Sequence, residues 1–366
     1  MVKVIHFTSC IRRGGIERQV SEIIRYSKNI EHIWVSLHYS KDNYLNSENK
    51  WYTINSRNII KRIKEFNKVV KSFKPMVVVC WDVAPYIIAL FSKGIRRNQI
   101  INASIQHGIL KKTKRGYLRM FIAHLSKYVM ANSQAGLRVN KLKKGIILYN
   151  GVNERFNKEN YIKEDQSPNK RDYPILVSIM NMILYKDYFT IFKSLELLKL
   201  EGINFTYYII GDGPLRANYE LYLSKSIIKN NVFLLGNIIS PEEYLGKADI
   251  FIHSSKGEGV SNAILEAMYM GLPIITTDKG GTLEILEDNA ITFSYQDYYA
   301  LYEGLKILIS DGKLRKRMGD KSHSIVKEKF TTERMVRNYE RIINAVSNNN
   351  YDSISDLIYT KSDKKS

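Results

Sequence analysis

The sequence has few cysteines and lacks long apolar runs. Cys10 and Cys80 are the two cysteines in its 366 residues, and both lie in or beside apolar, strand-like segments. This excludes a disulfide framework, and we expect the reduced cysteines of an intracellular protein. Without a Cys/His cluster, no metal site is expected. No apolar stretch reaches the roughly 18 residues of a membrane-spanning helix. The first residues, MVKVIHFTSC, are expected to form a strand and not a signal peptide.

Acidic residues are scarce in the first half of the chain. Residues 1–150 hold 28 Lys and Arg but 7 Asp and Glu, whereas residues 151–366 hold 28 and 29. The net charge of +20 therefore comes from the first half. A field of one sign favours an anionic partner, such as a membrane surface, a phosphorylated acceptor or nucleic acid. A general lysine bias is the alternative, but it would have charged both halves. No nucleic-acid-binding module accompanies the charges, so nucleic acid is not an expected partner.

Two basic segments are candidates for contact with an anionic membrane. Residues 57–74 carry lysines beside an apolar face, and residues 111–130 open with KKTKR, followed by Leu118, Phe121 and Leu125. Basic amphipathic helices of this kind bind anionic lipid surfaces. A core helix with a solvated basic face is the alternative for each segment.

Short apolar runs alternate with longer helical patterns along the chain. Between the runs, apolar residues recur at helical spacing, as from Ile59 to Phe73. This alternation predicts an α/β protein with parallel sheets and helices on both faces. Strands are expected at residues 2–8, 32–37, 76–80, 100–105, 128–131, 146–148, 175–179, 205–210, 232–235, 249–252, 273–276 and 290–293.

The length of the chain predicts two domains. Residues 153–174 are polar, charged and carry two prolines, so they are the best linker candidate. We expect one Rossmann-like domain over residues 1–152 and a second over residues 153–330. Residues 349–366 are rich in Asn, Ser, Asp and Lys and are expected to form a frayed polar tail.

The strongest functional pattern lies in residues 249–286, which read as a strand, a glycine-broken turn, a helix and a second strand. Glu258 falls in the turn before Gly259, and Glu266 follows about two turns into the helix. Backbone N–H groups at a helix start favour an anion. The amides expected there belong to Val260, Ser261 and Asn262. A phosphate flanked by two carboxylates suits a nucleotide-sugar, whose sugar and ribose hydroxyls the glutamates can bind.

The spacing Glu-x7-Glu resembles the signature of the family-4 retaining glycosyltransferases, which have the GT-B fold. The resemblance implies two facing Rossmann-like domains, with ligands bound outside the carboxyl ends of their strands. It also implies a last helix, at about residues 331–348, that crosses back to the first domain. The alternative is a buried helix with two incidental glutamates.

The resemblance extends to the first half of the chain. Gly14 and Gly15, in CIRRGGIERQV, resemble the family's GG loop, which contacts the donor diphosphate. His107 follows an expected strand and matches a family histidine near the donor sugar, so a catalytic role is implied. A plain turn and a structural histidine are the alternatives. The arginines expected on the acceptor side of the loop are Arg12, Arg13 and Arg18.

In the second half, Asn181 and Lys186 match the pair of residues that neutralises the donor diphosphate in the family. The family commonly has Arg where Asn181 stands, so more of this task would fall to Lys186 and to helix amides. Asn237 and Ile238 match the loop that receives the nucleobase. Glu258 would orient the sugar, and Glu266 would bind the ribose.

The sequence lacks an Asp-x-Asp tripeptide, with which another glycosyltransferase architecture holds Mg²⁺ on the diphosphate. We therefore expect metal-independent chemistry with no cofactor, in which Lys186 and a helix dipole replace the cation. The resemblance implies retaining transfer of a hexose from a nucleoside-diphosphate sugar, with UDP favoured, to a saccharide or lipid-linked saccharide. Bacterial capsule or O-antigen synthesis at the inner face of the cytoplasmic membrane is the expected setting. A GT-B-fold epimerase, a pyridoxal-phosphate-dependent phosphorylase and an inactive scaffold subunit are the alternatives.

Overall fold

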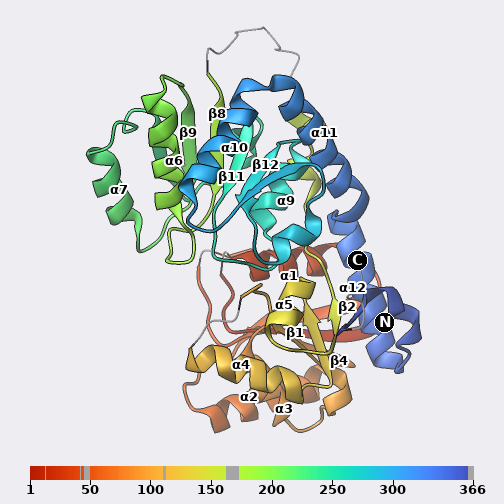
Figure 1. The fold of residues 1–366 in the computed structure, drawn as a ribbon. Coiled ribbons are helices and arrows are strands. Elements are labelled where there is room, and N and C mark those ends of the chain that lie inside the picture. The colour runs from red at the N-terminus through yellow and green to blue at the C-terminus, as the bar shows by residue number, and fades with distance from the viewer. Residues whose placement is uncertain (13, 42, 45–49, 110–112, 162–172, 362–366) are drawn as a thin grey trace. The chain divides into compact units, whose positions relative to one another are not determined.

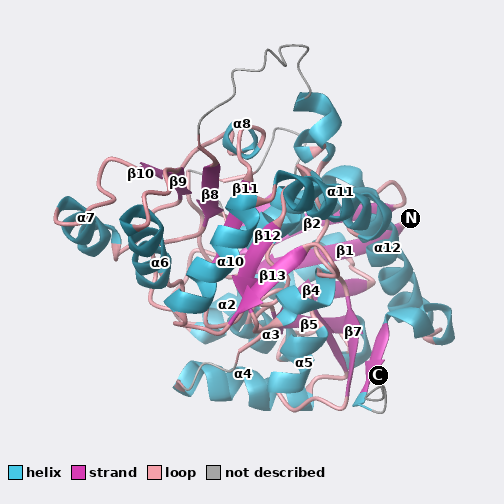
Figure 2. Cartoon of the chain, turned by 45° about the horizontal axis from the view of Figure 1, so that its top comes forward, coloured by secondary structure: helices cyan, strands magenta, loops and turns pink. Residues whose placement is uncertain are grey.

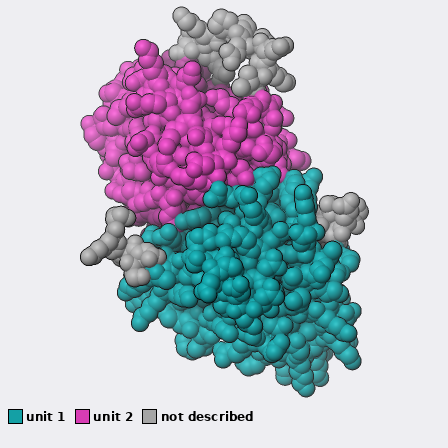
Figure 3. All heavy atoms as spheres, turned by 90° about the vertical axis from the view of Figure 1, so that its right-hand side faces the viewer, with its two compact units in different colours: residues 1–151, 332–366 teal, residues 152–331 magenta. Residues whose placement is uncertain are grey.

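The computed structural model describes residues 1–361 apart from residues 13, 42, 45–49, 110–112 and 162–172 (Figure 1). The chain divides into two compact units (Figure 3). Unit 1 comprises Met1–Gly151 together with Thr332–Ser366, and unit 2 comprises Val152–Thr331. Part of the expected linker, residues 162–172, lies outside the described residues, and the residues before it already belong to unit 2.

Unit 1 is built on an eight-stranded sheet with the order β14-β7-β6-β5-β4-β1-β2-β3. All neighbouring strands in it are parallel except β14, which runs antiparallel to β7. The strands are β1 (Val2–Thr8), β2 (Ile30–Ser36), β3 (Trp51–Thr53), β4 (Val77–Cys80), β5 (Ile100–Ile105), β6 (Tyr128–Ala131), β7 (Lys144–Ile147) and β14 (Ile358–Thr360).

Helices cover both faces of this sheet. Successive strand residues point to opposite sides, so a strand with consecutive apolar residues needs a helix layer on each side. Val4 packs with α1 and α12 in one core cluster, whereas its neighbour Ile5 packs with α2 and α3 in another. Unit 1 is therefore a three-layer α/β unit (Figure 2). Its helices are α1 (Gly15–Tyr26), α2 (Ile59–Phe73), α3 (Val83–Leu90), α4 (Lys114–Leu125), α5 (Gln134–Val139) and α12 (Thr332–Asn348).

Unit 2 contains a six-stranded, wholly parallel sheet with the order β10-β9-β8-β11-β12-β13. Its strands are β8 (Ile175–Ile179), β9 (Thr206–Ile210), β10 (Val232–Gly236), β11 (Ile250–His253), β12 (Ile274–Thr277) and β13 (Ala290–Phe293). Its helices are α6 (Tyr188–Leu200), α7 (Arg216–Ser224), α8 (Glu242–Leu245), α9 (Asn262–Tyr269), α10 (Tyr298–Ser310) and α11 (Gly312–Lys329).

The predicted α/β class with parallel sheets is confirmed in both units. The last helix, α12, belongs to unit 1 as expected, and Tyr339 and Ile343 are fully buried in the unit 1 core. The strand order reverses direction beside β8 in unit 2, so β8 and its neighbour β11 leave the sheet at a topological switch point. Ligands of open parallel sheets bind at such a point, outside the carboxyl ends of the strands.

The expectation of a frayed tail is wrong for residues 352–360. A 3₁₀ helix at Asp352–Leu357 places Ile354, which is fully buried, in the unit 1 core. Strand β14 then pairs with β7, and Tyr359 packs into the cluster beneath it. The composition of this segment is polar, but its apolar residues supply the burial that orders it. Strand β3, at Trp51–Thr53, was likewise not expected.

Within the part of the chain that the structure describes, every helix is too short or too polar to cross a membrane.

Candidate active site

Two loops of unit 2 are fastened to each other where β8 and β11 end. Lys186, before α6, forms an isolated antiparallel bridge with Ser255, which follows β11. Asp187 N–H donates to the carbonyl of Ser254 at 3.1 Å, and Lys256 N–H donates to the carbonyl of Tyr185 at 2.9 Å. Because β8 and β11 are neighbours in the sheet, the residues after each strand emerge side by side. This fastening brings Lys186 to the turn that carries Glu258.

Lys186, Glu258 and His253 form one cluster of ionisable side chains. Lys186 Nζ lies 2.5 Å from Glu258 Oε1 and 2.9 Å from His253 Nε2. His253 Nε2 is also 3.0 Å from Glu258 Oε2. The side chain of Glu258 keeps 18% exposure, against 7% for Lys186 and 1% for His253. Glu258 is thus the member of the cluster that solvent reaches most.

The electrostatics of the cluster favour an ionised glutamate. Burial alone would raise the pKa of Glu258, but the Lys186 ammonium and His253 outweigh it and hold that pKa well below its usual range. Burial lowers the pKa of Lys186, and the attraction of Glu258 opposes this shift. Burial and the adjacent Lys186 charge lower the pKa of His253 below its usual 6.5, so its imidazole is neutral at pH 7. At neutral pH the cluster is an ammonium–carboxylate pair with a neutral imidazole.

His253 is not among the site residues predicted from the sequence. It is the last residue of β11, at the end of the otherwise apolar run IFIH. A polar residue that closes a buried strand five positions before Glu258 was the available signal. Across the described residues, no group of three His, Cys, Asp or Glu side chains is arranged to hold a metal ion.

Glycines clamp the backbone of Glu258. Gly281 N–H donates to the carbonyl of Glu258 at 2.7 Å. Gly280 has a φ of +86°, and a Cβ on it would lie 2.4 Å from the Glu258 carbonyl oxygen and 2.7 Å from its nitrogen. Only glycine adopts this φ without strain and permits so close an approach. The Gly-Gly pair before β13 therefore fixes the position of Glu258.

Helix α9 begins directly after this turn. Val260 and Ser261 are buried, and Thr282 donates from Oγ1 to the Gly259 carbonyl at 3.4 Å. Glu266 lies on α9 with 3% exposure. The structure places Glu258 in the turn before the helix and Glu266 within the helix, but α9 begins at Asn262, so Glu266 lies about one turn into it and not two as expected. The first amides of a helix carry partial positive charge, so anions are favoured at this point.

Three more donor-side candidates, Asn181, Asn237 and Ile238, lie on loops that contact the turn at residues 211–214, of sequence GDGP. Gly211 and Gly213 pack so closely on the backbone of residues 180–182 that a Cβ on either would lie 2.5 Å or less from a carbonyl oxygen. Asn181 is exposed in the loop after β8. Gly211 N–H also donates to the carbonyl of Gly236 at 2.8 Å. In the loop that follows Gly236, Asn237 is exposed and Ile238 is partly exposed.

In unit 1, the start of α1 has a feature that sequence reasoning missed. The carboxylate of Glu17 folds over Gly14, so that a Cβ there would lie 2.4 Å from Glu17 Oε2. Arg12 Nε lies 3.6 Å from Glu17 Oε1, and burial raises the pKa of Glu17. A phosphate at Gly14 and Gly15 would therefore have to displace this carboxylate or meet it protonated. Arg13 lies outside the described residues, and Arg18 is partly buried in the first turn of α1.

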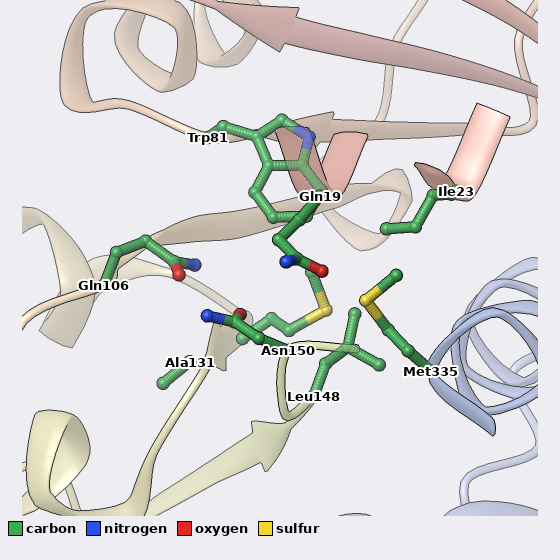
Figure 4. Close-up of a pocket in the computed structure, with 9 residues that line it drawn as sticks. Gln19, Ile23, Trp81, Gln106, Ala131, Leu148, Asn150 and Met335 are labelled. Carbon is green, nitrogen blue, oxygen red and sulfur yellow. The ribbon is translucent and has the colours of Figure 1, made fainter. Parts of the chain in front are cut away.

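A small pocket lies at the carboxyl ends of β4 to β7 in unit 1 (Figure 4). Gln19 closes one side, donating to the Gly151 carbonyl at 3.2 Å and accepting from its N–H at 3.1 Å. His107 is half-buried in the loop after β5, next to the lining residue Gln106. His107 belongs to unit 1 and Glu258 to unit 2, so their joint action stays a prediction. The lining residues are Gln19, Ile23, Trp81, Gln106, Met130, Ala131, Leu148, Asn150 and Met335.

A known family is similar to most of unit 2. Residues 160–324 match the family described as glycosyl transferases group 1. The matched residues lie within unit 2, which spans Val152–Thr331. Among curated proteins, the O-antigen biosynthesis glycosyltransferase WclY of Escherichia coli is 26% identical over 203 residues, which cover 54% of this chain and 55% of WclY. The chain thus spans about half the length of this relative.

Solved structures share the fold over 94% of this chain. A glycosyltransferase from Rickettsia africae aligns over 94% of this chain and 98% of its own, with a TM-score of 0.74 and 18% identity. Anabaena HepE, solved in complex with UDP-glucose, aligns over 94% of this chain and 100% of its own, with a TM-score of 0.78 and 15% identity. The fold is GT-B, and the chain resembles glycosyltransferases of bacterial surface polysaccharides.

Proposed function

We propose that this protein is a retaining, metal-independent hexosyltransferase of the family-4 type. In this proposal it moves a sugar from a UDP-sugar to a saccharide or lipid-linked saccharide of a bacterial surface polysaccharide. The observation that supports the proposal is the Lys186–Glu258 pair of 2.5 Å, at the carboxyl ends of the unit 2 strands and directly before α9. It joins a cation for phosphate, a carboxylate for hydroxyls and a helix start in one place.

The donor would bind with its diphosphate at Lys186 and at the backbone amides that lead into α9, from Gly259 to Asn262. As the bond to the sugar breaks, negative charge grows on the leaving phosphate, and fixed positive groups stabilise it more in the transition state than in the ground state. Lys186 and the helix amides supply that charge without a metal ion. Front-face departure, in which the leaving phosphate accepts the acceptor proton, would retain the anomeric configuration.

Hydroxyl recognition falls to the two glutamates in this proposal. Glu258, ionised and partly exposed, would orient the sugar, and Glu266 would bind the ribose. Asn237 and Ile238 would receive the base, for which uracil is favoured because HepE, a structural relative, binds UDP-glucose. The acceptor would occupy unit 1, beside the arginines around Gly14 and Gly15, while His107 would lie near the donor sugar and take a catalytic role.

The exposed side chains of helix α4 support the proposal that the acceptor is lipid-linked and that the protein attaches to the inner membrane surface. Tyr117, Leu118, Phe121 and Leu125, which we call the α4 patch, are 45–61% exposed on one side of the helix. They are therefore not part of a core, which was the alternative for this segment. Lys114, Arg115 and Lys127 are exposed beside them. Apolar side chains flanked by cations fit the surface of an anionic bilayer.

Nucleotide binding tests the donor site. Calorimetry or thermal shift of the purified protein against UDP, GDP, ADP, CMP and UDP-sugars, with and without EDTA, should show EDTA-insensitive binding of one nucleotide class. Glu266→Ala should abolish it. Glu258→Gln should lower turnover by about a hundredfold while changing donor affinity far less. Equal losses of both would mean that the roles of the glutamates are wrong.

Product analysis separates this proposal from its alternatives. A transferase releases nucleotide only when an acceptor is present. An epimerase converts the nucleotide-sugar, or releases its nucleotide, without an acceptor. Binding without turnover over a panel of lipid-linked acceptors would indicate a scaffold subunit.

Vesicle sedimentation tests the α4 patch. The protein should bind vesicles that contain phosphatidylglycerol and not vesicles of phosphatidylcholine alone, and salt should weaken the binding. Phe121→Glu should reduce binding at least fivefold. Leu200→Glu is the matched control, because Leu200 is a 73% exposed helical residue of unit 2. Equal binding by both variants would contradict the assignment of the patch.

A further inference from the structure

The imidazole of His253 faces two groups that make opposite demands on one nitrogen. Nε2 lies 2.9 Å from Lys186 Nζ and 3.0 Å from Glu258 Oε2. An ammonium only donates hydrogen bonds and a carboxylate only accepts them, whereas a neutral imidazole nitrogen does one or the other. At any moment, Nε2 can therefore satisfy Lys186 or Glu258, but not both.

The other ring nitrogen allows both choices. His253 Nδ1 lies 3.3 Å from Thr276 Oγ1 on the neighbouring strand β12. A hydroxyl both donates and accepts, so Thr276 can pair with Nδ1–H or with bare Nδ1. In one tautomer, Nδ1–H donates to Thr276 and Nε2 accepts from Lys186. In the other, Thr276 donates to Nδ1 and Nε2–H donates to Glu258.

We propose that His253 is a positioning residue that changes tautomer when the donor binds. Without donor, Lys186 is held by Glu258 Oε1 and by His253 Nε2. A diphosphate offers Lys186 a stronger anionic partner, and the lysine that turns to it leaves Glu258 without its cation. Nε2–H then donates to Glu258 and keeps the carboxylate oriented toward the sugar. This inference rests on the proposed function and assigns that site a residue which the sequence pattern did not include.

The surroundings of His253 also predict a pH dependence. The charged or titratable groups that face it are Lys186 and Glu258 from the two fastened loops, while Thr276 offers a neutral hydroxyl. Tyr185 lies beside Glu258, and burial raises its pKa to about 12, so it stays neutral. An imidazolium would donate to Glu258 permanently and repel Lys186. Acidification below pH 6.5 should therefore displace the lysine and weaken the donor site.

NMR of the imidazole ring nitrogens tests the inference without any donor. In the ligand-free wild type, His253 should carry its proton on Nδ1. In Lys186→Met, which removes the ammonium, the proton should move to Nε2. His253→Gln identifies the signal. His323→Gln, a second histidine of unit 2 that contacts the Tyr269 carbonyl through Nδ1 at 2.7 Å, is the control and should leave it unchanged. The same tautomer in wild type and Lys186→Met would overturn the role of His253.

Kinetics with a nucleotide-sugar separate positioning from a merely structural role. Both phosphates of the donor are diesters that stay ionised from pH 5 to 8, so any acid limb belongs to the protein. His253→Leu should lower kcat about ten- to a hundredfold with a smaller effect on KM. His253→Gln, which can still donate or accept at the Nε2 position, should recover most of the activity and lose the acid limb of kcat/KM.

The two ideas fail in different ways. If His253→Leu lowered only Tm, and His253→Gln kept the acid limb, His253 would be structural and the proposed function would stand. If the folded wild type bound no nucleotide-sugar at any pH, the proposed function would fail, and the donor-linked role of His253 with it.

Discussion

His6 Nε2 lies 3.0 Å from His32 Nδ1 in the interior of unit 1. Trp81 donates its indole N–H to the other nitrogen of His6 at 3.2 Å, which fixes the proton of His6 on Nε2 and makes His32 Nδ1 the acceptor. An added proton would have to face another N–H. Burial lowers the pKa of both histidines, and that of His32 falls from 6.5 to about 4.

This pair predicts acid lability. The unfolded chain takes up protons below pH 6.5 but the folded chain does not, so stability should fall as the pH drops from 6.5 toward 4. His32 alone should account for about 2 kcal/mol between pH 7 and pH 5. Urea unfolding at both pH values measures the loss. His32→Asn, which keeps an acceptor near Nδ1, should remove this part, while His124→Asn, at an exposed position, should not. Equal losses in both variants would contradict the prediction.

Gly280→Ala should disturb Glu258 directly. The new Cβ would lie 2.4 Å from the Glu258 carbonyl oxygen, in addition to the strain at φ +86°. Gly202 is the matched control, because its φ is +78° but no described heavy atom lies within 4 Å of the added Cβ. Strain alone costs about 1–2 kcal/mol, so Gly280→Ala should exceed Gly202→Ala by at least about 1 kcal/mol in unfolding free energy. It should also lower donor turnover. Equal costs would mean that the turn yields freely.

Lys186 and Glu258 should be strongly coupled in stability. Breaking a buried pair by removing one partner leaves a charge uncompensated, at a cost of about 3 kcal/mol or more. Lys186→Met and Glu258→Gln should therefore each destabilise unit 2, and the double variant should cost about 1–3 kcal/mol less than their sum. Denaturant unfolding measures this cycle. The same cycle on the exposed Lys306–Glu201 pair should give a much weaker coupling, because water screens that pair. Additive effects at Lys186 and Glu258 would refute the coupling.

The C-terminal segment should contribute to folding. Ile354 is fully buried in the unit 1 core, so Ile354→Ala should cost about 2–4 kcal/mol by leaving a cavity. Leu200→Ala, at a 73% exposed position, should change stability by less than about 0.5 kcal/mol. Chemical denaturation of the full chain measures both. A cost for Ile354→Ala as small as that of the control would restore the expectation of a frayed tail.

Local sequence patterns predicted much of the fold. The bounds expected for β1, β5, β6, β8 and β13 match those of the structure. Strands β5, β6 and β8 are apolar runs that the sheet buries on both faces, whereas β13 is an edge strand with Phe293 as its buried residue. The short strands β3 and β14 were not predicted from the sequence, because three residues form a strand only when a partner strand supplies the hydrogen bonds. Strand β3 pairs in parallel with β2. Strand β14 pairs antiparallel with β7, which is remote in the sequence.

The sequence by itself determined the α/β class, the return of α12 to unit 1, and the positions of Glu258 and Glu266 around a helix start. The class follows from periodicity and the two glutamates from spacing along one segment, while the return of α12 was implied by the resemblance to GT-B glycosyltransferases. The tertiary structure alone decided that Lys186 pairs with Glu258, that His253 stands between them, and that Gly280 must approach the Glu258 backbone. Such contacts join loops that neighbouring strands bring together, and no local pattern encodes which strands become neighbours. The same holds for the α4 patch, because a helical stripe of apolar residues does not say whether another element will cover it.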